Sequence, residues 1–310
     1  MDENKNDDLL LAWNIKPPFQ LLKIEDELGF NSQNMIVDTT SGVLLLKSVS
    51  DKCRETFIES LEIQNFAAEN GAPVPRVLST VENSLVHEGS GNCYGLMEFC
   101  SSDNQVDAQE RPIWVAHSLA QLHTVLRDCP IVPENKSGYD WLTNEEWNLI
   151  KNELENSSSE DPFGANVLEY FEICQSISKK MSDASPTQLV HLDCHPANVC
   201  FPAAGLPRII DFGHIQQVPR MLALSFCCHR FAGFDNRMTS EFYEAYSATE
   251  PLEDTEIKLH WKYLILESSR RINYLLRQHF FESETKWDFE LNRKLEVIQQ
   301  AVFKMMESRI

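Results

Sequence analysis

Two short apolar runs, each followed by an acidic residue, constrain this chain more than any other feature of its sequence. One run leads to Asp193 and the other to Asp211, and both read as short strands that would hold the carboxylates rigidly. Asn198 follows Asp193 after four intervening residues, in a loop that contains Pro196. Carboxylate and amide oxygens are the ligands that magnesium prefers in proteins. The sequence therefore predicts a magnesium site to which Asn198 and Asp211 supply oxygens.

The order of these residues is more informative than any one of them, because Asp and Asn are common in loops that contain proline. Kinases have a catalytic loop in which an Asp is followed, after four residues, by an Asn, and then a metal loop with the sequence Asp-Phe-Gly. Asp193, Asn198 and Asp211-Phe212-Gly213 have this arrangement. In that arrangement Asp193 would orient and deprotonate an incoming hydroxyl group. Asn198 and Asp211 would hold Mg2+ against the phosphates of ATP.

The same stretch permits other interpretations. His191 and His195, together with the two aspartates, could form a transition-metal site, but no further ligand motif accompanies them. His191 is more simply explained as a residue that braces the loop by hydrogen bonding. His195 either braces the loop as well or contacts phosphate. Cys194 is either a reactive thiol or a small packed residue.

Composition and charge exclude several classes of protein. The chain of 310 residues is 43% hydrophobic and 24% charged, as expected for a soluble globular protein. Its 47 acidic and 27 basic residues give a net charge of −20, which would repel the phosphate backbone of a nucleic acid. The acidic surplus could attract a cationic substrate, but it is explained more simply as a means of keeping the protein soluble. The longest apolar stretches, such as Met221–Cys228, are too short for a membrane helix.

The cysteines and the first residues indicate a reducing compartment. The nine cysteines are an odd number and none forms a C-x-x-C pair, so reduced thiols are the simplest interpretation. Met1–Asp8 is polar and acidic, unlike a secretory signal with its basic start and apolar centre. We therefore expect a cytoplasmic location.

The hydrophobic pattern divides the chain into a strand-rich part and a helical part. Met35–Val37 and Val43–Lys47 predict a hairpin, and the apolar spacing within Lys52–Asn70 predicts a helix that Gly71 ends. Short strands are expected around 76–78, 84–86 and 94–99. Beyond residue 103 the pattern predicts helices over 112–126, 147–154 and 167–177, short strands at 188–190, 199–201 and 208–210, and helices from 220 onward.

The catalytic stretch resembles a known family. His191-x-Asp193-x-His195-x-x-Asn198, followed by Asp211, is similar to the aminoglycoside phosphotransferase and choline kinase family, the small-molecule branch of the kinase-like superfamily. The resemblance covers most of the chain. It implies a two-lobed, protein-kinase-like α+β fold with a small β-rich N-lobe over residues 1–99 and a larger, mostly helical C-lobe over 100–310. It also implies an enzyme that uses ATP and Mg2+ to phosphorylate an alcohol.

The resemblance extends to the nucleotide site. Gly29–Asn34, which includes Asn34, looks like the hairpin that covers the phosphates, and Val43–Lys47 is similar to the strand whose lysine contacts them. Met97, Glu98 and Phe99 look like the hinge, whose backbone would hydrogen-bond adenine.

The following helix would supply an ion-pair partner for Lys47. Glu59 is our choice, and Glu62, three residues further on, could serve instead. The family usually has Gly where this chain has Leu192, a departure that bears on the acceptor pocket without removing a chemical group.

The sequence indicates a small acceptor. No activation segment or Ala-Pro-Glu element follows Asp211-Phe212-Gly213, so a platform for docking peptides is missing. The resemblance implies a hydroxylated acceptor such as an amino-alcohol or an aminoglycoside. The alternatives are a nucleotide-binding regulatory pseudokinase, although Lys47, Asp193, Asn198 and Asp211 are all retained, and an atypical protein kinase. Some aromatic and acidic residues of the helical part could line the acceptor pocket, although each could equally be an ordinary core or surface residue. These candidates are Trp141, Trp261, Tyr263 and Glu267.

Overall fold

The chain is organised as two compact units, each built from segments that are separate in the sequence. The first unit comprises Met1–Pro133, His195–Ile215 and Glu244–Glu250, and the second comprises Glu134–Cys194, Gln216–Tyr243 and Pro251–Ile310. These units are defined by the packing of the chain, whereas the predicted lobes 1–99 and 100–310 are defined by their functional roles. The division into these two lobes therefore stays a prediction. The computed structural model describes residues 9–24, 32–102, 106–133, 143–156, 167–168, 186–282 and 288–307.

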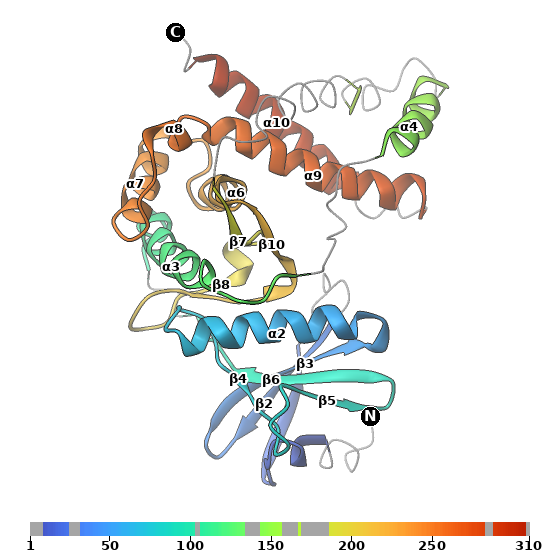
Figure 1. The fold of residues 1–310 in the computed structure, drawn as a ribbon, viewed down its shortest axis with the longest axis vertical. Coiled ribbons are helices and arrows are strands. Elements are labelled where there is room, and N and C mark those ends of the chain that lie inside the picture. The colour runs from blue at the N-terminus through green and yellow to red at the C-terminus, as the bar shows by residue number, and fades with distance from the viewer. Residues whose placement is uncertain are drawn as a thin grey trace. The chain divides into compact units, whose positions relative to one another are not determined.

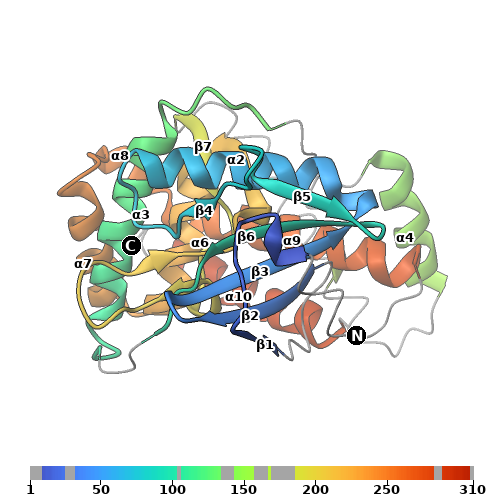
Figure 2. The same cartoon turned by 90° about the horizontal axis from the view of Figure 1, so that it is seen from below.

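The first unit contains an antiparallel sheet (Figures 1 and 2). The predicted hairpin is confirmed as strands β2 and β3, which pair along their whole length through the turn before Gly42. β5 begins at Val86, so the strand expected around 84–86 lies later than predicted. The strands are β1 (Phe19–Lys23), β2 (Ser32–Thr39), β3 (Gly42–Ser50), β4 (Val77–Leu78), β5 (Val86–Gly89) and β6 (Asn92–Glu98), in the order β1-β2-β3-β6-β4 with β5 also paired to β6.

Helix α2 (Arg54–Glu69) packs against this sheet and confirms the helix predicted within Lys52–Asn70. Its buried residues Phe57 and Leu61 lie so close to Gly95 of β6 that an added Cβ there would be 2.7 Å from Leu61 Cδ1 and 3.1 Å from Phe57 Cζ. Gly95 is paired with Lys47 on the neighbouring strand. Because directly opposed residues of an antiparallel pair point to the same face, the Lys47 side chain lies on the face that carries α2. On the opposite face, residues of the sheet and of the segment before β1 form a buried apolar cluster of Leu10, Trp13, Met35, Val37, Leu46 and Leu96.

Helix α3 and a short hairpin also belong to the first unit. Helix α3 (Arg111–Leu126) matches the predicted range 112–126, and its Ser118 Oγ donates a hydrogen bond of 2.7 Å to the carbonyl of Pro207. The hairpin consists of β8 (Val199–Cys200) and β9 (Arg208–Ile209), which confirms the short strands expected there.

The second unit is mostly helical. Its two-stranded sheet pairs β7 (Thr187–His191) with β10 (Ile215–Pro219). Strand β10 was not predicted, because its polar residues Gln216 and Gln217 interrupt the apolar pattern. Helices α9 and α10 lie side by side, and α6 packs on α9 (Figure 1). Among the described residues its helices are α4 (Asn144–Asn156), α6 (Arg220–Ala232), α7 (Asn236–Ser247), α8 (Asp254–Ile257), α9 (His260–Phe280) and α10 (Asp288–Glu307). The last residues of α7, from Glu244 on, belong to the first unit.

The helices predicted over 147–154 and from 220 onward are confirmed by α4 and by α6 to α10. Most of the helix predicted over 167–177 lies outside the described residues. Within the described ranges, no helix combines the length and the apolar character that a membrane span requires.

A buried ion pair joins α6 to α8 in the second unit. Arg220 donates to Glu256 over 3.0 Å and 2.6 Å, and the two side chains are only 8% and 4% exposed. Removing one partner leaves the other charge buried, which typically costs about 3–5 kcal/mol. We expect Glu256→Ala to lower the free energy of unfolding by that amount in chemical denaturation. As a control, Glu241→Ala removes the partner of Arg237, which is 63% exposed, and should change stability by less than about 1 kcal/mol.

Candidate active site

An ion pair joins two residues that are far apart in the sequence. Lys47 Nζ, from the middle of β3, lies 2.8 Å from Asp211 Oδ1. Both residues belong to the first unit. The Lys47 side chain is 17% exposed and that of Asp211 is 42% exposed, so the pair is open to solvent on the Asp211 side. The fold thus brings together two residues that the sequence assigned to one nucleotide site.

Asp211 adopts a backbone conformation that is unfavourable for a residue with a side chain. Its φ of 63° and ψ of 77° lie in the left-handed region. Such outliers persist where the surrounding structure fixes them, and they cluster at functional sites. The next residues, Phe212–His214, form a single 3-10 turn that packs against α2, with Phe212 buried. The carboxylate is therefore held from the backbone side as well as by Lys47.

The β8–β9 hairpin fixes Asn198 near this carboxylate. Val199 is paired with Ile209, and the carbonyl of Asn198 accepts a 3.0 Å hydrogen bond from the amide of Ile210. Asn198 comes just before β8 and Asp211 comes shortly after β9, so both residues lie at the open end of one antiparallel hairpin. Asn198 is 8% exposed.

Asn34 faces the same region from the neighbouring strand. It is the cross-strand partner of Lys47 in the β2–β3 pair, so both side chains lie on one face of the sheet. Its Oδ1 atom is buried and has no hydrogen-bond partner within the described part of the chain. Such an acceptor suits a ligand that donates a hydrogen bond. The first half of the predicted phosphate-covering hairpin, Gly29–Asn31, lies outside the described residues.

The predicted hinge lies at the end of β6. The amide of Glu98 donates to the carbonyl of Arg76 over 2.9 Å, and the amide of Phe99 donates to that of Val43 over 3.4 Å. The side chain of Met97 is buried. Both amides therefore form hydrogen bonds within the fold, and the assignment of these residues as a hinge stays a prediction.

The structure pairs Lys47 with Asp211 and leaves the proposed helix partner open. On α2, Glu59 is half-buried and Glu62 is exposed. The assignment of Glu59 or Glu62 as the partner of Lys47 stays a prediction.

Asp193 lies in the second unit, where Arg271 of α9 holds it. Arg271 Nη2 donates to Asp193 Oδ1 over 2.9 Å and to the carbonyl of Leu192 over 2.7 Å. The amide of Asp193 donates to His191 Nδ1 over 3.2 Å, so His191 braces the loop as expected. The Asp193 side chain is 16% exposed. The carboxylate is thus fixed in orientation and remains accessible.

Arg271 was missed by sequence reasoning, although Glu267 was singled out. The two residues are one helical turn apart, and Arg271 Nε donates to Glu267 Oε1 over 2.9 Å. The available signal was a pair of adjacent arginines, Arg270 and Arg271, in a helix whose neighbouring positions are apolar and buried. A charge in such a stretch normally has a partner elsewhere in the fold.

The other candidates near the catalytic loop have structural explanations. Cys194 is completely buried, and its Sγ lies 3.4 Å from that of Cys227, which fits a packed small residue. His195 Nδ1 accepts a 3.2 Å hydrogen bond from the amide of Ala197 and so caps the following turn. Among the described residues, no group of three or more His, Cys, Asp or Glu side chains could hold a metal ion.

The aromatic candidates for the acceptor pocket differ in their surroundings. Trp261 stacks on Phe234, with ring centroids 5.6 Å apart and planes inclined by 15°. Tyr263 is buried in the second unit. Trp141 lies outside the described residues.

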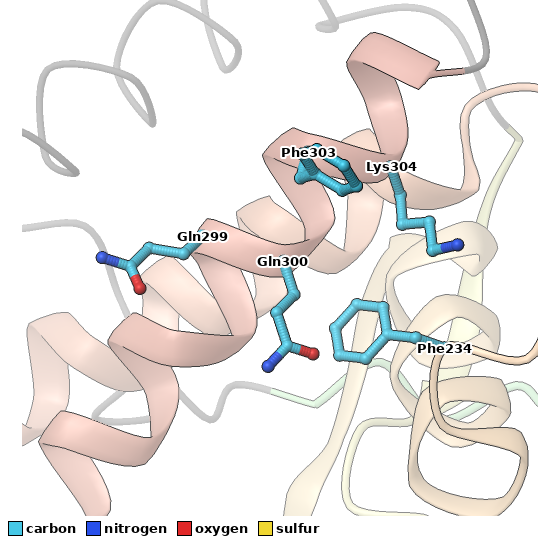
Figure 3. A pocket seen from close by; sticks show the side chains of 5 residues that line it. All are labelled: Phe234, Gln299, Gln300, Phe303 and Lys304. Atoms are coloured by element: carbon cyan, nitrogen blue, oxygen red, sulfur yellow. The ribbon is translucent and has the colours of Figure 1, made fainter.

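Each unit has a shallow pocket. In the first unit, a pocket of about 470 Å³ adjoins the predicted hinge at Phe99 and is also lined by Cys200 and Arg208. In the second unit, a pocket of about 280 Å³ lies between α10 and Phe234, whose ring faces Gln300 (Figure 3). None of the predicted catalytic or metal-binding residues lines the second pocket.

Comparison with known proteins agrees with this arrangement. A family model described as "Phosphotransferase enzyme family" matches residues 25–255. No curated protein sequence matches the chain.

Solved structures match at low identity over almost the whole length. A spectinomycin phosphotransferase bound to ADP and spectinomycin is similar with a TM-score of 0.68 and 17% identity, covering 97% of this chain and 94% of the other. A microcompartment-associated aminopropanol kinase gives 0.67 and 13%, covering 97% and 95%. The choline kinase LicA from Streptococcus pneumoniae gives 0.62 and 16%, covering 98% and 99%. The prediction of a kinase-like α+β fold is confirmed.

Proposed function

Because the chain belongs to the phosphotransferase enzyme family, we propose that it transfers the γ-phosphoryl group of ATP to a hydroxyl group of a small metabolite. The family confirms the resemblance noted in the sequence and identifies the chain as a phosphotransferase. Solved structures of similar fold include enzymes named for spectinomycin, aminopropanol and choline, which supports an amino-alcohol or aminoglycoside-like acceptor. We also propose a cytoplasmic location, because an odd number of cysteines is most simply explained by reduced thiols.

The ion pair between Lys47 and Asp211 is the observation that carries this proposal. It supports a nucleotide site in the first unit, with Lys47 directed at the α- and β-phosphates. Asn34, on the same face as Lys47, would add a polar contact. Adenine would form hydrogen bonds with backbone groups of the segment Met97, Glu98 and Phe99.

The residues at the open end of the β8–β9 hairpin fit magnesium. The Asn198 amide and the Asp211 carboxylate offer the hard oxygen donors that this ion prefers, and the hairpin brings them to one place. When bound, magnesium would neutralise charge on the phosphates. Lys47 would then exchange its bond with Asp211 for one with a phosphate oxygen.

Asp193 is proposed as the residue that orients the acceptor hydroxyl and accepts its proton. Its bond with Arg271 occupies one carboxylate oxygen and fixes the plane of the group, which supports a positioning role for Arg271. A general base must present its oxygen within hydrogen-bonding reach of the hydroxyl. Neither alternative, a pseudokinase or an atypical protein kinase, is favoured, because the chemical groups are present and β10 leads directly into α6 without a docking segment.

The proposal is tested by an acceptor screen. Purified protein with ATP and Mg2+ is incubated with panels of amino-alcohols, aminoglycosides, hydroxy acids and neutral polyols, and ADP release is measured. We expect at least one panel to stimulate ADP release, with the phosphorylated product identified by phosphorus NMR. Asp193→Asn, assayed in parallel, separates true transfer from contaminating activity. Equal ADP release by both proteins with every panel would contradict the proposed function.

A further inference from the structure

Three cationic side chains surround one aromatic ring in the second unit. The ring belongs to Phe226 of α6, and the Arg271 guanidinium carbon lies 4.0 Å from its centroid. Lys294 Nζ of α10 lies 5.4 Å from the same centroid, and the guanidinium carbon of Arg230 of α6 lies 6.0 Å from it. We call Arg230, Arg271 and Lys294 the cationic cluster. Its members come from the three helices α6, α9 and α10, which pack together (Figure 1).

Carboxylates match only part of this positive charge. Arg271 is paired with Asp193 and Glu267. Lys294 is 7% exposed, and the described part of the chain gives it no hydrogen bond or ion pair. The Nε atom of Arg230 is also buried and has no hydrogen-bond partner among the described residues. Within the described part of the chain, buried Lys294 and half-buried Arg230 therefore have no hydrogen bond or ion pair to a carboxylate.

The electrostatics are consistent with a missing negative group. Burial, followed by the positive charges of Arg271, Arg230 and Arg293, lowers the pKa of Lys294 to about 7, against a smaller opposing effect of Glu267. Burial, followed by the positive charges of Arg293 and Arg271, likewise lowers the pKa of Arg230, against smaller opposing effects of Glu290 and Asp193. His229, which also faces Lys294, has its pKa lowered to about 4 by burial and by that lysine. Burying an unpaired charge is costly, so such a site gains stability when it binds an anion.

We propose that Arg230 and Lys294 form an anion subsite that binds a carboxylate or phosphate group of the acceptor. The proposal rests on the function proposed above, because Arg271 belongs to the cluster and also contacts Asp193. An acceptor bound there would present its hydroxyl group to Asp193 and its anionic group to the two cations. The acceptor class is thereby narrowed to amino-alcohols that also carry a carboxylate or phosphate group, such as hydroxylated amino acids, whose ammonium group would suit the acidic protein.

The test uses two-carbon alcohols that differ only in the second functional group. Glycolate carries a carboxylate, 2-hydroxyethyl phosphate carries a phosphate, ethylene glycol is neutral and ethanolamine is cationic. Binding to the full-length protein without nucleotide is followed by NMR titration. We expect the carboxylate or the phosphate compound to bind at least about tenfold more tightly than the neutral and cationic ones, the scale of a hydrogen bond to a charged group. The preferred anion identifies which of the two groups the acceptor carries.

A pair of matched variants locates the binding. Lys294→Met removes the charge and keeps a long apolar side chain, and it should lower the affinity for the preferred anion by at least about tenfold. Lys258→Met makes the same change at an exposed lysine of the second unit and should leave the affinity unchanged. Equal affinity of wild type and Lys294→Met would overturn the subsite, and the lysine would then be a purely structural residue over Phe226.

The pH dependence gives a check on the wild-type protein alone. Lys294 binds an anion best when it is protonated, so a bound carboxylate should raise its pKa above the free value of about 7. Glycolate affinity should therefore be full below pH 7 and fall as the pH rises from 7 toward 9. A flat profile over that range would contradict the proposal. Because these titrations involve no turnover, they are separable from the proposed function, which the loss of activity in Asp193→Asn tests independently.

Discussion

Asp193→Asn is expected to lower turnover by at least about a hundredfold while leaving nucleotide affinity nearly unchanged, the scale expected for a positioned general base. Asparagine has the same shape, and its Oδ1 can still accept the hydrogen bond that Arg271 donates to Asp193. The loop should therefore keep its geometry while losing the group that accepts the proton. Steady-state ADP release in the presence of an acceptor measures turnover, and calorimetry with Mg2+ and a non-hydrolysable ATP analogue measures nucleotide affinity.

A control separates this effect from a general change of charge. Asp254→Asn alters an exposed aspartate at the start of α8 in the same unit, and it should leave turnover unchanged. Undiminished turnover in Asp193→Asn would remove Asp193 from its proposed role, whatever the acceptor is.

Asp211→Ala is expected to weaken magnesium-dependent nucleotide binding by at least about tenfold, as loss of a group that supports a metal typically does. The substitution removes a proposed metal ligand and also the partner that holds Lys47 at 2.8 Å. Nucleotide affinity is measured by calorimetry with Mg2+ and with EDTA. Wild type should bind more tightly with the metal, and the variant should show little difference between the two conditions.

The matched control for this prediction is Asp38→Ala. Asp38 is an exposed residue of β2 in the same unit, and its replacement should leave both affinities unchanged. Thermal denaturation of Asp211→Ala shows whether the variant is folded before its affinity is interpreted. If wild-type protein bound the nucleotide equally well with and without the metal, the assignment of Asp211 as a magnesium ligand would be wrong.

The sequence predicted the elements whose patterns are local. Helix α3 has an unbroken apolar stripe, and its observed range is within one residue of the prediction. The hairpin of β2 and β3 was recognisable from its apolar runs and its turn. Lys47 and Asp211 were assigned to one site through motifs alone, and the fold brings them into contact.

The interactions that the sequence did not predict depend on tertiary packing. Arg271 contacts Asp193 from a helix that begins 67 positions later, since β7 and the loop after it reach α9 only in the folded unit. The residues of the cationic cluster come from three helices that pack around Phe226. The hydrophobic period of a single helix cannot predict which residues of other helices it will contact. Strand β10 lacks the alternation that identifies a strand, because Gln216 and Gln217 are adjacent polar residues, and its pairing with β7 exists only in the folded unit.

At position 211, the residue that would give the most stable backbone differs from the residue that the proposed chemistry needs. Glycine adopts φ values near 63° at no steric cost, whereas a side chain there is disfavoured by roughly 1–2 kcal/mol. A redesign of this chain for thermal robustness alone would therefore choose Gly at position 211 and discard the carboxylate with it. Substitutions intended to raise the thermal stability of the protein should therefore leave Asp211 unchanged and be made at other positions.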